Sequence, residues 1–473
     1  RCTVQRAEGK MNKGRKEIMQ KINRRVFLKG ATLGAAALAA PTIIPATAFG
    51  ANERIALGCI GVGGMGTGNM RNFLAADACR VVAVCDVQRD RRERAKKTVD
   101  EKYGDTGCAM YGDYRELLAR KDIDAVMIAA QDHWHSLIAT AAAKAKKDMY
   151  CEKPTGVCIN DGFAIRKAVR KHKRVFQSGM WQRSLGNFRQ GCELALNGYL
   201  GKITEIEVAV PAGKSFQPKY KGPYEPQPVP DGFDWAMWLG PARFSPFNPA
   251  RVTYPDWYLH NDYCEGWTTN WGVHHLDIAH WGCPLLSKES FEIEVSDVSY
   301  YVNQGFGDNI ATWKAVLAYE SGLRVVFTDA AQKPQGTKFI GEKGWVYVDR
   351  NDKIVASDNL LSVRPKEGDT RLLPVDSMSF DDVTTIKTKD GERTGYKNVN
   401  HAEGLLNAMR SRKDPIADID ATHVASTLGM ITGIAARLQQ KLKWDWKTER
   451  FVGNDLANAM LVRPMHNGWK LDV

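Results

Sequence analysis

The stretch Arg54-Ile-Ala-Leu-Gly-Cys-Ile-Gly-Val-Gly-Gly-Met-Gly-Thr-Gly-Asn69 decides the fold of this chain. Strand-forming residues lead into Gly61-x-Gly63-x-x-Gly66, and a helix-like segment follows over Asn69–Ala76. In such a turn one glycine allows the tight bend, one lets the backbone approach a pyrophosphate, and one lets helix and strand pack closely. The helix N-terminus offers free N–H groups to the phosphates. The stretch therefore predicts a dinucleotide-binding turn, whose cofactor-binding residues are Gly61, Gly63, Gly64, Met65 and Gly66.

A carboxylate closes the next strand-like run, Arg80-Val-Val-Ala-Val-Cys-Asp86, 20 residues after Gly66. At this place a carboxylate accepts hydrogen bonds from the adenosine ribose and repels a 2′-phosphate, so Asp86 favours NAD over NADP. Three nearby arginines soften this preference because they can neutralise a phosphate: Arg89, Arg91 and Arg92. A plain helix N-cap is the alternative role for Asp86.

Strand and helix patterns continue to alternate up to residue 178. We expect helices at Tyr114–Arg120, Ser136–Lys146 and Gly162–His172, and strands at Ala125–Ala130, Met149–Glu152 and Val175–Gly179. This rhythm predicts a doubly wound parallel sheet, that is, a Rossmann domain over residues 51–178. Such sheets bind ligands at the carboxyl ends of their strands, where Glu152-Lys153-Pro154 falls. Since Pro154 cannot continue a central strand, Lys153 is held at a fixed site and can transfer a proton if its pKa is brought down.

Composition and charge are ordinary for a soluble globular protein and do not favour a nucleic-acid-binding protein. The 473 residues are 44% hydrophobic and 25% charged, with a net charge of +12. Residues 1–30 hold ten Lys/Arg and two acidic residues, so +8 lies there and only +4 remains for the rest of the chain. That remainder implies no polyanionic partner, and we expect no nucleic acid.

The basic N-terminal segment has another explanation. Asn23-Arg24-Arg25-Val-Phe-Leu-Lys29 precedes a mild apolar run, Ala31–Ile44, and Ala46-Thr-Ala48 offers a small-residue cleavage site. This pattern resembles a twin-arginine export signal, although Asn23 stands where Ser or Thr is usual. We therefore expect residues 1–50 to be a leader, the location to be periplasmic, and the mature protein to have no membrane span.

Cysteines and histidines predict neither a disulfide framework nor a metal site. The ten cysteines are scattered without a Cys-x-x-Cys motif, and only Cys264 and Cys283 are left open as a pair. His274, His275 and His280 do not share one helical face, and no Cys or Glu cluster joins them.

The order of the motifs, Gly61/63/66, Asp86, Asp132-His-Trp-His135 and Glu152-Lys-Pro154, resembles the glucose–fructose oxidoreductase / inositol dehydrogenase (Gfo/Idh/MocA) family over essentially the whole mature chain. The resemblance implies a second, α+β domain over residues 179–473, with a large, mostly antiparallel sheet and C-terminal helices that pack back on the Rossmann domain. In this family the exposed face of that sheet often mediates oligomers, so we expect a dimer or tetramer. The resemblance also places the lysine beside the nicotinamide and the reacting hydroxyl. It implies further cofactor contacts from Gln131, His135, Glu152, Lys153 and Arg183, although Gln131 replaces the usual Pro.

A second signature lies in Gly266-Trp-Thr-Thr-Asn-Trp-Gly-Val-His274. It resembles the family's Gly-x-x-x-Asp-x-x-x-His as Gly266, Asn270 and His274, with Asn in place of Asp. Asn positions a hydroxyl but cannot accept a proton, so acid/base work falls to Lys153 and His274. The predicted catalytic residues are Lys153, His274 and Asn270, and the predicted substrate contacts are Lys153, Arg183, Tyr263, Asn270 and His274. A salt bridge at the domain interface is the alternative role for Arg183.

The second half also contains an aromatic, Pro-rich stretch over residues 211–262, which suits sugar rings or a loop packed by its own aromatic side chains. Residues 358–396 look loop-rich. The expected regular elements are helices at Gly186–Asn197, at His401–Arg410 and from an Asp420 or Thr422 cap to Lys441, and strands at Ile203–Val210, Phe291–Val302, Thr312–Tyr319, Leu323–Thr328, Lys338–Ile340, Gly344–Val348 and Lys353–Ser357.

These observations predict an NAD-dependent oxidoreductase that transfers hydride between a secondary hydroxyl of a sugar, glycoside or cyclitol and tightly bound NAD(H). Two alternatives remain open at this point. One is a glycosidase or epimerase that works through transient oxidation by bound NAD, and the other is a non-catalytic sugar-binding protein.

Overall fold

The computed structural model describes residues 54–211, 218–301, 307–373, 382–388 and 391–472. The predicted export leader, residues 1–50, lies outside the described residues. All the elements named below belong to one compact unit of the chain.

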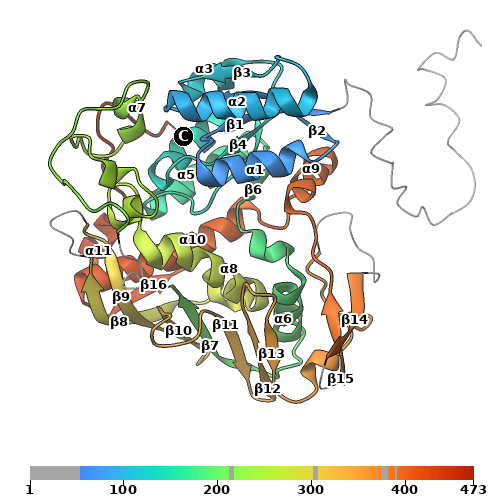
Figure 1. Cartoon of the computed structure of the whole chain (residues 1–473). Coiled ribbons are helices and arrows are strands. Elements are labelled where there is room, and N and C mark those ends of the chain that lie inside the picture. Colours follow the sequence, from blue (N-terminus) through green and yellow to red (C-terminus); the bar gives the residue numbers. More distant parts are fainter. Residues whose placement is uncertain (1–53, 212–217, 302–306, 374–381, 389–390, 473) are drawn as a thin grey trace, which may run out of the picture. The chain divides into compact units, whose positions relative to one another are not determined.

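The first domain is built on a six-stranded sheet with the order β3-β2-β1-β4-β5-β6 (Figure 1). All its strand pairs are parallel, which confirms the predicted doubly wound sheet. The strands are short, and β4, β5 and β6 are buried throughout, as expected for strands covered on both faces of a sheet. Their bounds are β1 Ile55–Ile60, β2 Cys79–Cys85, β3 Ala109–Tyr111, β4 Ala125–Ile128, β5 Asp148–Cys151 and β6 Phe176–Ser178.

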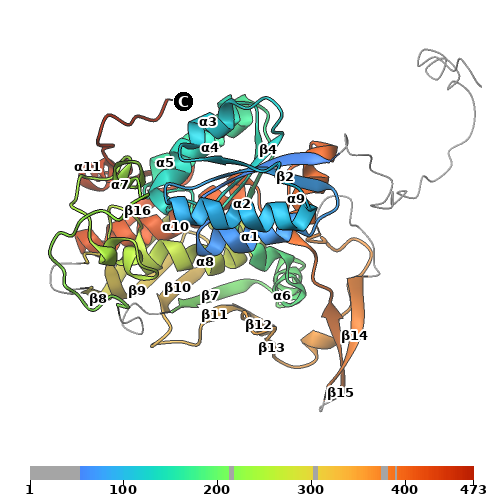
Figure 2. The ribbon, with the colours of Figure 1, turned by 45° about the horizontal axis from the view of Figure 1, so that its top comes forward.

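Helices cover both faces of this sheet (Figure 2). Helices α1 (Gly64–Leu74), α2 (Arg89–Tyr103) and α9 (His401–Ser411) share one core with it, and α3 (Tyr114–Ala119), α4 (His135–Lys144) and α5 (Ile159–Lys171) share the other. The sequence did not predict α2. That helix buries only Ala95 and Val99, so its apolar stripe is too thin to show a helical period.

The second domain is built on a nine-stranded sheet with the order β13-β12-β11-β7-β10-β9-β8-β16-β17. Only β7 and β10 pair in parallel, so the sheet is mostly antiparallel, as predicted. Helices α6 (Gly186–Leu196), α8 (Gly272–Gly282) and α10 (Ile419–Leu438) share its main hydrophobic core. The strand bounds are β7 Ile203–Val210, β8 Phe291–Tyr300, β9 Ile310–Tyr319, β10 Arg324–Asp329, β11 Gly336–Gly341, β12 Gly344–Val348, β13 Ile354–Ala356, β16 Leu442–Asp445 and β17 Arg450–Phe451.

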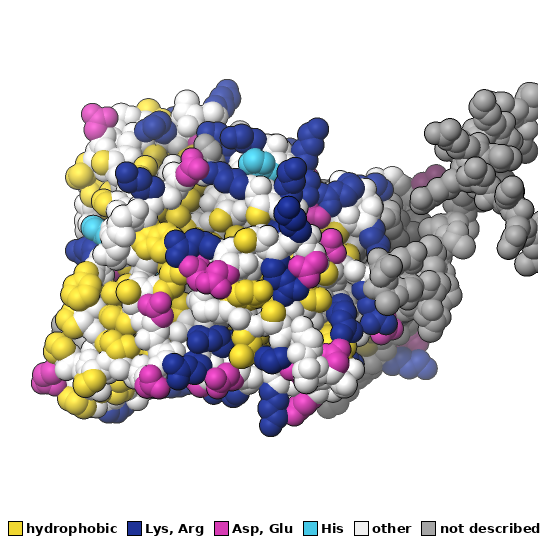
Figure 3. Space-filling model, turned by 90° about the horizontal axis from the view of Figure 1, so that it is seen from above, with side chains coloured by type: hydrophobic (Ala, Val, Ile, Leu, Met, Phe, Trp, Pro, Cys, Tyr) yellow, Lys and Arg dark blue, Asp and Glu magenta, His cyan; other side chains and the backbone are white. Residues whose placement is uncertain are grey.

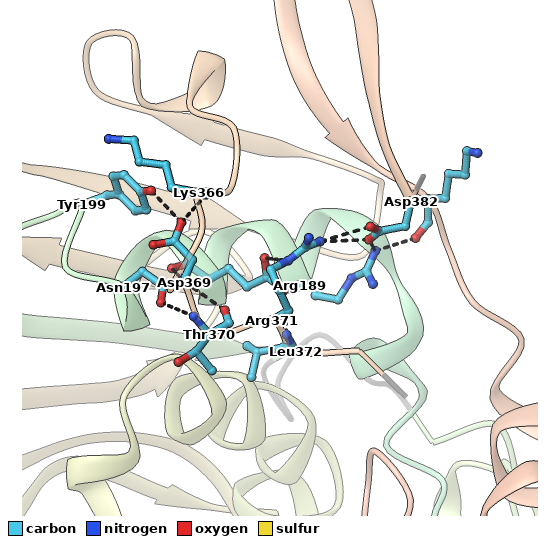
Figure 4. Close-up of polar contacts among 11 residues, drawn as sticks. Arg189, Asn197, Tyr199, Lys366, Asp369, Thr370, Arg371, Leu372 and Asp382 are labelled. Carbon is cyan, nitrogen blue, oxygen red and sulfur yellow. Dashed lines mark hydrogen bonds and ion pairs between the residues drawn. The ribbon is translucent and has the colours of Figure 1, made fainter. Parts of the chain in front are cut away.

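The stretch expected to be loop-rich contains a hairpin, β14 (Val383–Thr388) and β15 (Gly391–Tyr396). A buried ionic network ties this region to α6 (Figure 4). Arg189 pairs with Asp382 at 2.7 Å, and Arg371 pairs with Glu193 at 2.9 Å and with Asp382 at 3.1 Å. The polar sequence that suggested a loop is therefore satisfied by long-range charge pairs, which a local pattern does not reveal.

The long helix α10 begins earlier than expected, because Asp418 caps it by accepting from the Ala421 N–H at 2.8 Å. It contacts both halves of the unit. The Ser426 hydroxyl accepts from the Thr155 N–H at 3.2 Å, and Gly429 lies so close to the Thr268 carbonyl that a Cβ would come within 2.7 Å of its oxygen. Small residues on α10 thus bring the segment that carries Asn270 close to the Rossmann domain.

Three predictions from the sequence concern features of the described residues: membrane-spanning helices, a disulfide and a metal-binding cluster. There, no helix combines the length and apolar character needed to cross a bilayer. Cys264 and Cys283 are free thiols. No group of three or more His, Cys, Asp or Glu side chains within these ranges is arranged to hold a metal ion. On the face shown in Figure 3, Lys and Arg side chains are scattered with Asp and Glu side chains between them.

Candidate active site

A cavity of about 1010 Å³ opens at the carboxyl ends of the Rossmann strands. Its other wall is the described aromatic segment, residues 218–262, which we call the strap; its residues 212–217 lie outside the described ranges. The strap contains α7 (Trp235–Leu239) and two short 3-10 turns. The predicted site residues that line the cavity are Gly61, Gly63, Gly64, Met65, Asp86, Gln131, His135, Glu152, Lys153 and Asn270.

The glycine turn has the geometry that a dinucleotide requires. Gly61 has φ +78°, and a Cβ there would lie 2.6 Å from the backbone of Ala129. A Cβ on Gly66 would overlap the Gly61 carbonyl, so this third glycine lets α1 pack on β1. A Cβ on Gly64 would meet no protein atom within 4 Å, and the Gly63 N-cap makes no side-chain cap hydrogen bond. The first turn of α1 therefore faces open space with unused N–H donors, which fits a pyrophosphate.

Asp86 lines the cavity beside the glycine turn. One of its carboxylate oxygens accepts from the Val62 N–H at 3.0 Å and the other from the Gln88 N–H at 2.9 Å. Burial raises its pKa, and the charge of Arg91 opposes that rise. Arg91 also reaches the turn, because its Nη1 would lie 3.0 Å from a Cβ on Gly63. A carboxylate and a guanidinium therefore both face the place where a ribose would bind.

The strap closes over this end of the cavity through backbone hydrogen bonds. The Arg89 N–H donates to the Gly232 carbonyl at 2.8 Å, and the Asp234 N–H donates to the Val87 carbonyl at 3.0 Å. Further along, Trp134 Nε1 donates to the Trp238 carbonyl at 3.0 Å. The loop that follows β2 and the loop that follows β4 both hold the strap in this way.

Aromatic side chains of the strap have both of the roles considered from the sequence. Trp235 stacks on Trp238 with ring centroids 4.9 Å apart, so part of the strap is packed by its own rings. Trp238 also lines the cavity, together with five further rings of the strap: Phe233, Phe247, Tyr254, Trp257 and Tyr258.

Lys153 stands at the centre of the site. Its Nζ donates to Asn270 Oδ1 at 2.7 Å and to the Asn270 carbonyl at 3.1 Å, which joins the Rossmann domain to the segment before α8. Burial lowers the pKa of Lys153, and the charges of Asp132 and Glu152 oppose that shift. A lysine with a lowered pKa next to a cavity is suited to proton transfer.

Asn270 is itself held by a buried carboxylate. Its Nδ2 donates to Asp132 Oδ2 at 2.8 Å. Because a carboxylate only accepts, this bond fixes the amide with its oxygen toward Lys153. Burial raises the pKa of Asp132, while His135, Lys153 and Asn270 lower it. Asp132 was not predicted as a site residue, although its place in Asp132-His-Trp-His135 offered the signal.

His274 lies on the first turns of α8, and its ring centroid is 5.8 Å from that of Trp271. Its Nδ1 is buried and has no hydrogen-bond partner among the described residues. Burial, followed by the charges of Arg350 and Lys153, lowers its pKa well below the ordinary value. His274 is therefore a neutral imidazole that can donate or accept one hydrogen bond toward a ligand.

Glu152 and His135 form hydrogen bonds that hold the elements around the site together. Glu152 Oε1 accepts from Asn69 Nδ2 at 2.9 Å, which ties α1 to the end of β5. His135 Nδ1 lies 2.7 Å from the Pro154 carbonyl, and its Nε2 lies 3.0 Å from the Ala130 carbonyl. Both side chains also line the cavity, as does Gln131.

Three of the predicted substrate contacts, Arg183, Tyr263 and His274, are absent from the cavity lining. The Arg183 guanidinium pairs with Asp277 of α8, with Nη2 2.6 Å and Nε 2.8 Å from its oxygens, and Nη1 donates to the Ile416 carbonyl at 2.8 Å. This is the alternative role weighed from the sequence, a buried structural ion pair. Tyr263 has no exposed surface, packs on Trp238, and is absent from the cavity lining. Tyr254 and Tyr258 of the strap line the cavity instead.

Family comparisons cover almost the whole described chain. Residues 55–180 match the model of the Gfo/Idh/MocA oxidoreductase family with its NAD-binding Rossmann fold. Residues 187–390 and 392–471 match the C-terminal alpha/beta domain of the same oxidoreductase family.

Individual relatives match over shorter segments. The chain is 33% identical to myo-inositol 2-dehydrogenase of Thermotoga maritima over 147 residues, 31% of this chain and 42% of that protein. It is 32% identical to a glycosyl hydrolase family 109 protein of Saccharopolyspora erythraea over 161 residues, 31% and 35% of the two chains. The chain therefore spans less than half the length of these curated relatives.

A solved structure shares the fold over a longer range. The scyllo-inositol dehydrogenase of Lactobacillus casei, determined with bound NAD(H) and scyllo-inositol, superposes with a TM-score of 0.52 at 17% identity, covering 82% of this chain and 99% of that one. With both family models matched in order along the chain, this protein belongs to the Gfo/Idh/MocA oxidoreductase family.

Proposed function

We propose that this protein is an NAD-dependent dehydrogenase that acts on a secondary hydroxyl of a sugar, glycoside or cyclitol. The observation that carries the proposal is the position of Lys153, which reaches the cavity from the end of β5 and is oriented by Asn270 of the other domain. The match to myo-inositol 2-dehydrogenase of Thermotoga maritima also supports the proposal.

When bound, NAD supplies the acceptor for a hydride that leaves the substrate carbon with its electron pair. Lys153, in its neutral form, takes the proton from the hydroxyl oxygen as the carbonyl forms. Asn270 accepts from the lysine and so aims Nζ at one place in the cavity. His274 follows Asn270 by one helical turn and is proposed to offer its neutral imidazole to a substrate oxygen. The rings of Tyr254 and Tyr258 line the cavity.

We also propose NAD rather than NADP as the cofactor, with Asp86 as the supporting residue. Arg91 lies close enough to pair with a 2′-phosphate, so this part of the proposal has a direct test. Binding of NAD and NADP to the nucleotide-free protein should be compared by calorimetry, and Asp86→Ala should narrow the difference between their dissociation constants.

Export by the twin-arginine route and a periplasmic location complete the proposal, on the strength of Asn23-Arg24-Arg25 and the apolar run that follows. Because proteins on that route fold before they cross, NAD would be loaded inside and retained. Replacing Arg24 and Arg25 with Lys should leave the protein in the cytoplasmic fraction. Unchanged periplasmic recovery would contradict the export proposal.

The decisive experiment is an absorbance spectrum of the purified protein before and after addition of a panel of glycosides and cyclitols. Retained NAD gives a shoulder at about 260 nm, and hydride transfer gives a new band at about 340 nm. The absence of both nucleotide binding and a 340 nm band with every substrate would overturn the dehydrogenase proposal.

A second candidate is supported by the match to a glycosyl hydrolase family 109 protein. In that case the same Lys153 and NAD site would oxidise the sugar transiently, and the glycosidic bond would break before the sugar is reduced again. Product analysis separates the two. Free aglycone without accumulated NADH favours the hydrolase, and a keto-sugar with NADH favours the dehydrogenase.

For assembly we propose a homo-oligomer through the outer face of the large sheet, where β7, β11 and β12 carry charged and aromatic side chains around a hollow of about 280 Å³. Glu207 pairs with Lys333 there, and Lys338 and Lys353 line the same hollow and add positive charge to this face. Light scattering on Trp345→Glu should show dissociation, whereas an unchanged mass would place the contact elsewhere.

A further inference from the structure

Arg350 is an unusual arginine beside the proposed substrate site. It lies in the turn between β12 and β13, and its guanidinium carbon is 4.7 Å from the ring centroid of Trp181 and 4.3 Å from that of Trp271. Its Nε donates to Gln182 Oε1 at 2.8 Å. Two indole rings and one hydrogen bond therefore hold the guanidinium plane in one orientation.

This guanidinium lacks the acidic partner that buried arginines usually have. Its Nη2 is buried and has no hydrogen-bond partner, and no carboxylate among the described residues forms an ion pair with Arg350. Burial lowers its pKa to about 10, with Glu152, Tyr258 and Tyr254 as the groups that oppose the shift. A buried cation with an unused donor is costly unless a ligand completes its hydrogen bonds.

Arg350 is absent from the cavity lining, but the three groups that act on its charge, Glu152, Tyr258 and Tyr254, all line the cavity. Trp271, on which it stacks, directly follows Asn270, the residue that orients Lys153. The same ring packs against His274, whose Nδ1 is also buried without a partner. Two polar groups with an unused hydrogen-bonding atom, Arg350 and His274, thus both contact the ring of Trp271.

We propose that Arg350 binds an oxyanion carried by the substrate, so that the preferred substrate is an acidic sugar, with a carboxylate or a phosphate, rather than a neutral one. The guanidinium fork matches both anions. The charge of Glu152 acts on Arg350, but no carboxylate among the described residues lies within ion-pair distance of the guanidinium, whose Nη2 keeps an unused donor for a ligand. This inference rests on the proposed function for its chemistry, but the binding of the anion is separable from turnover.

The first test compares turnover of three sugars by the NAD-loaded protein: methyl glucuronide, glucose 6-phosphate and methyl glucoside. One of the acidic sugars should exceed the neutral one in kcat/KM by at least about 30-fold, the lower range for a buried charged pair. Which acid wins distinguishes a carboxylate from a phosphate. Arg350→Ala should lower kcat/KM for the preferred acidic sugar by at least about 30-fold more than for the neutral sugar, and Arg350→Lys should keep part of the advantage.

The second test needs no turnover. Binding of glucuronate and of glucose 6-phosphate to the NAD-loaded protein is measured by calorimetry and by quenching of tryptophan fluorescence, since Trp181 and Trp271 flank the guanidinium. Arg324, which is exposed and pairs with Glu205 on the large sheet, provides the control Arg324→Ala. Circular dichroism checks that each variant is folded.

The outcomes separate this inference from the proposed function. Anion binding that Arg350→Ala abolishes and Arg324→Ala preserves supports the inference even if no sugar is oxidised. It is overturned if neither anion binds, if the neutral sugar is preferred, or if Arg350→Ala lowers turnover of acidic and neutral sugars equally.

Discussion

At the residue scale, position 270 lacks a carboxylate, and the carboxylate of Asp132 lies next to it instead. Asn270 stands where the family's signature has an acid, and its amide joins Lys153 to Asp132. The negative charge is therefore still near the lysine, one hydrogen bond further away. Asp132 is the second largest influence on the pKa of Lys153, after burial, and it raises that pKa.

Asp132→Asn should consequently lower the pKa of Lys153 further. Because the neutral lysine is the active base, the rising limb of kcat/KM against pH should move to lower pH in this variant. The double variant Asp132→Asn with Asn270→Asp returns the charge to the signature position and should move the limb back. A limb that stays at the wild-type pH in Asp132→Asn would show that the carboxylate has no influence on the lysine.

The role of Lys153 itself has a matched control in the same domain. Lys147 is also buried, but its Nζ donates to the Arg120 and Ile123 carbonyls, away from the cavity. Lys153→Ala should reduce kcat by at least about 100-fold while NAD remains bound, as expected for loss of a general base. Lys147→Ala should lower stability and leave kcat of the folded protein within a few-fold. Full activity of Lys153→Ala would refute the catalytic assignment.

At the element scale, helix α1 meets strand β1 through Gly66, while neighbouring Gly64 faces open space. Gly66→Ala should force α1 away from the Gly61 carbonyl and lower the free energy of unfolding by about 1–3 kcal/mol, the usual cost of overpacking. Gly64→Ala should leave the nucleotide-free protein as stable as the wild type and weaken NAD binding. Urea unfolding of the nucleotide-free variants measures the first effect, and calorimetry measures the second. Equal loss of stability in both would contradict the packing argument.

The strap covers the end of the cavity where the adenosine of NAD is proposed to bind, so we expect it to slow the dissociation of NAD. Gly232 has φ +74°, and a Cβ there would come within 2.9 Å of Arg89 Cβ at the contact that holds the strap. Gly232→Ala should loosen this contact and speed the dissociation of NAD. Gly322 has φ +88° with no atom near its Cβ position and lies in the β9–β10 turn, so Gly322→Ala carries similar backbone strain without touching the cavity. Stopped-flow displacement of bound NADH compares them, and equal rates would mean that the strap does not retain the cofactor.

The elements that the sequence predicted well are those with a strong local period. The buried strands of the first sheet, such as Ala125–Ile128, are short apolar runs and were expected within about two residues at each end. Helix α2 and the hairpin β14–β15 were missed, since the first buries two side chains and the second depends on charge pairs with distant residues. Local pattern carries no information about such pairs.

At the scale of the whole molecule, the site is assembled from two domains, and this limits what the sequence can show. Lys153 and Asn270 were both predicted, but their direct contact depends on how α10 brings the segment before α8 against the Rossmann domain. Arg350 was missed because nothing in its local sequence marks it. Its role appears only when a turn of the large sheet places it between Trp181 and Trp271.

The same assembly predicts which ion pairs hold the molecule together. Arg183, in the crossover between the domains, pairs with Asp277 of α8 where both side chains are buried, whereas Arg170 pairs with Asp414 where both are more than 40% exposed. Asp277→Asn leaves a buried guanidinium without its counter-charge and should cost about 3–5 kcal/mol of unfolding free energy. Asp414→Asn should cost less than about 1 kcal/mol. The urea midpoints of the two variants, measured without NAD, give the difference. A similarly small shift of the midpoint in both variants would mean that the Arg183–Asp277 pair does not stabilise the junction between the domains, on which the position of Asn270 depends.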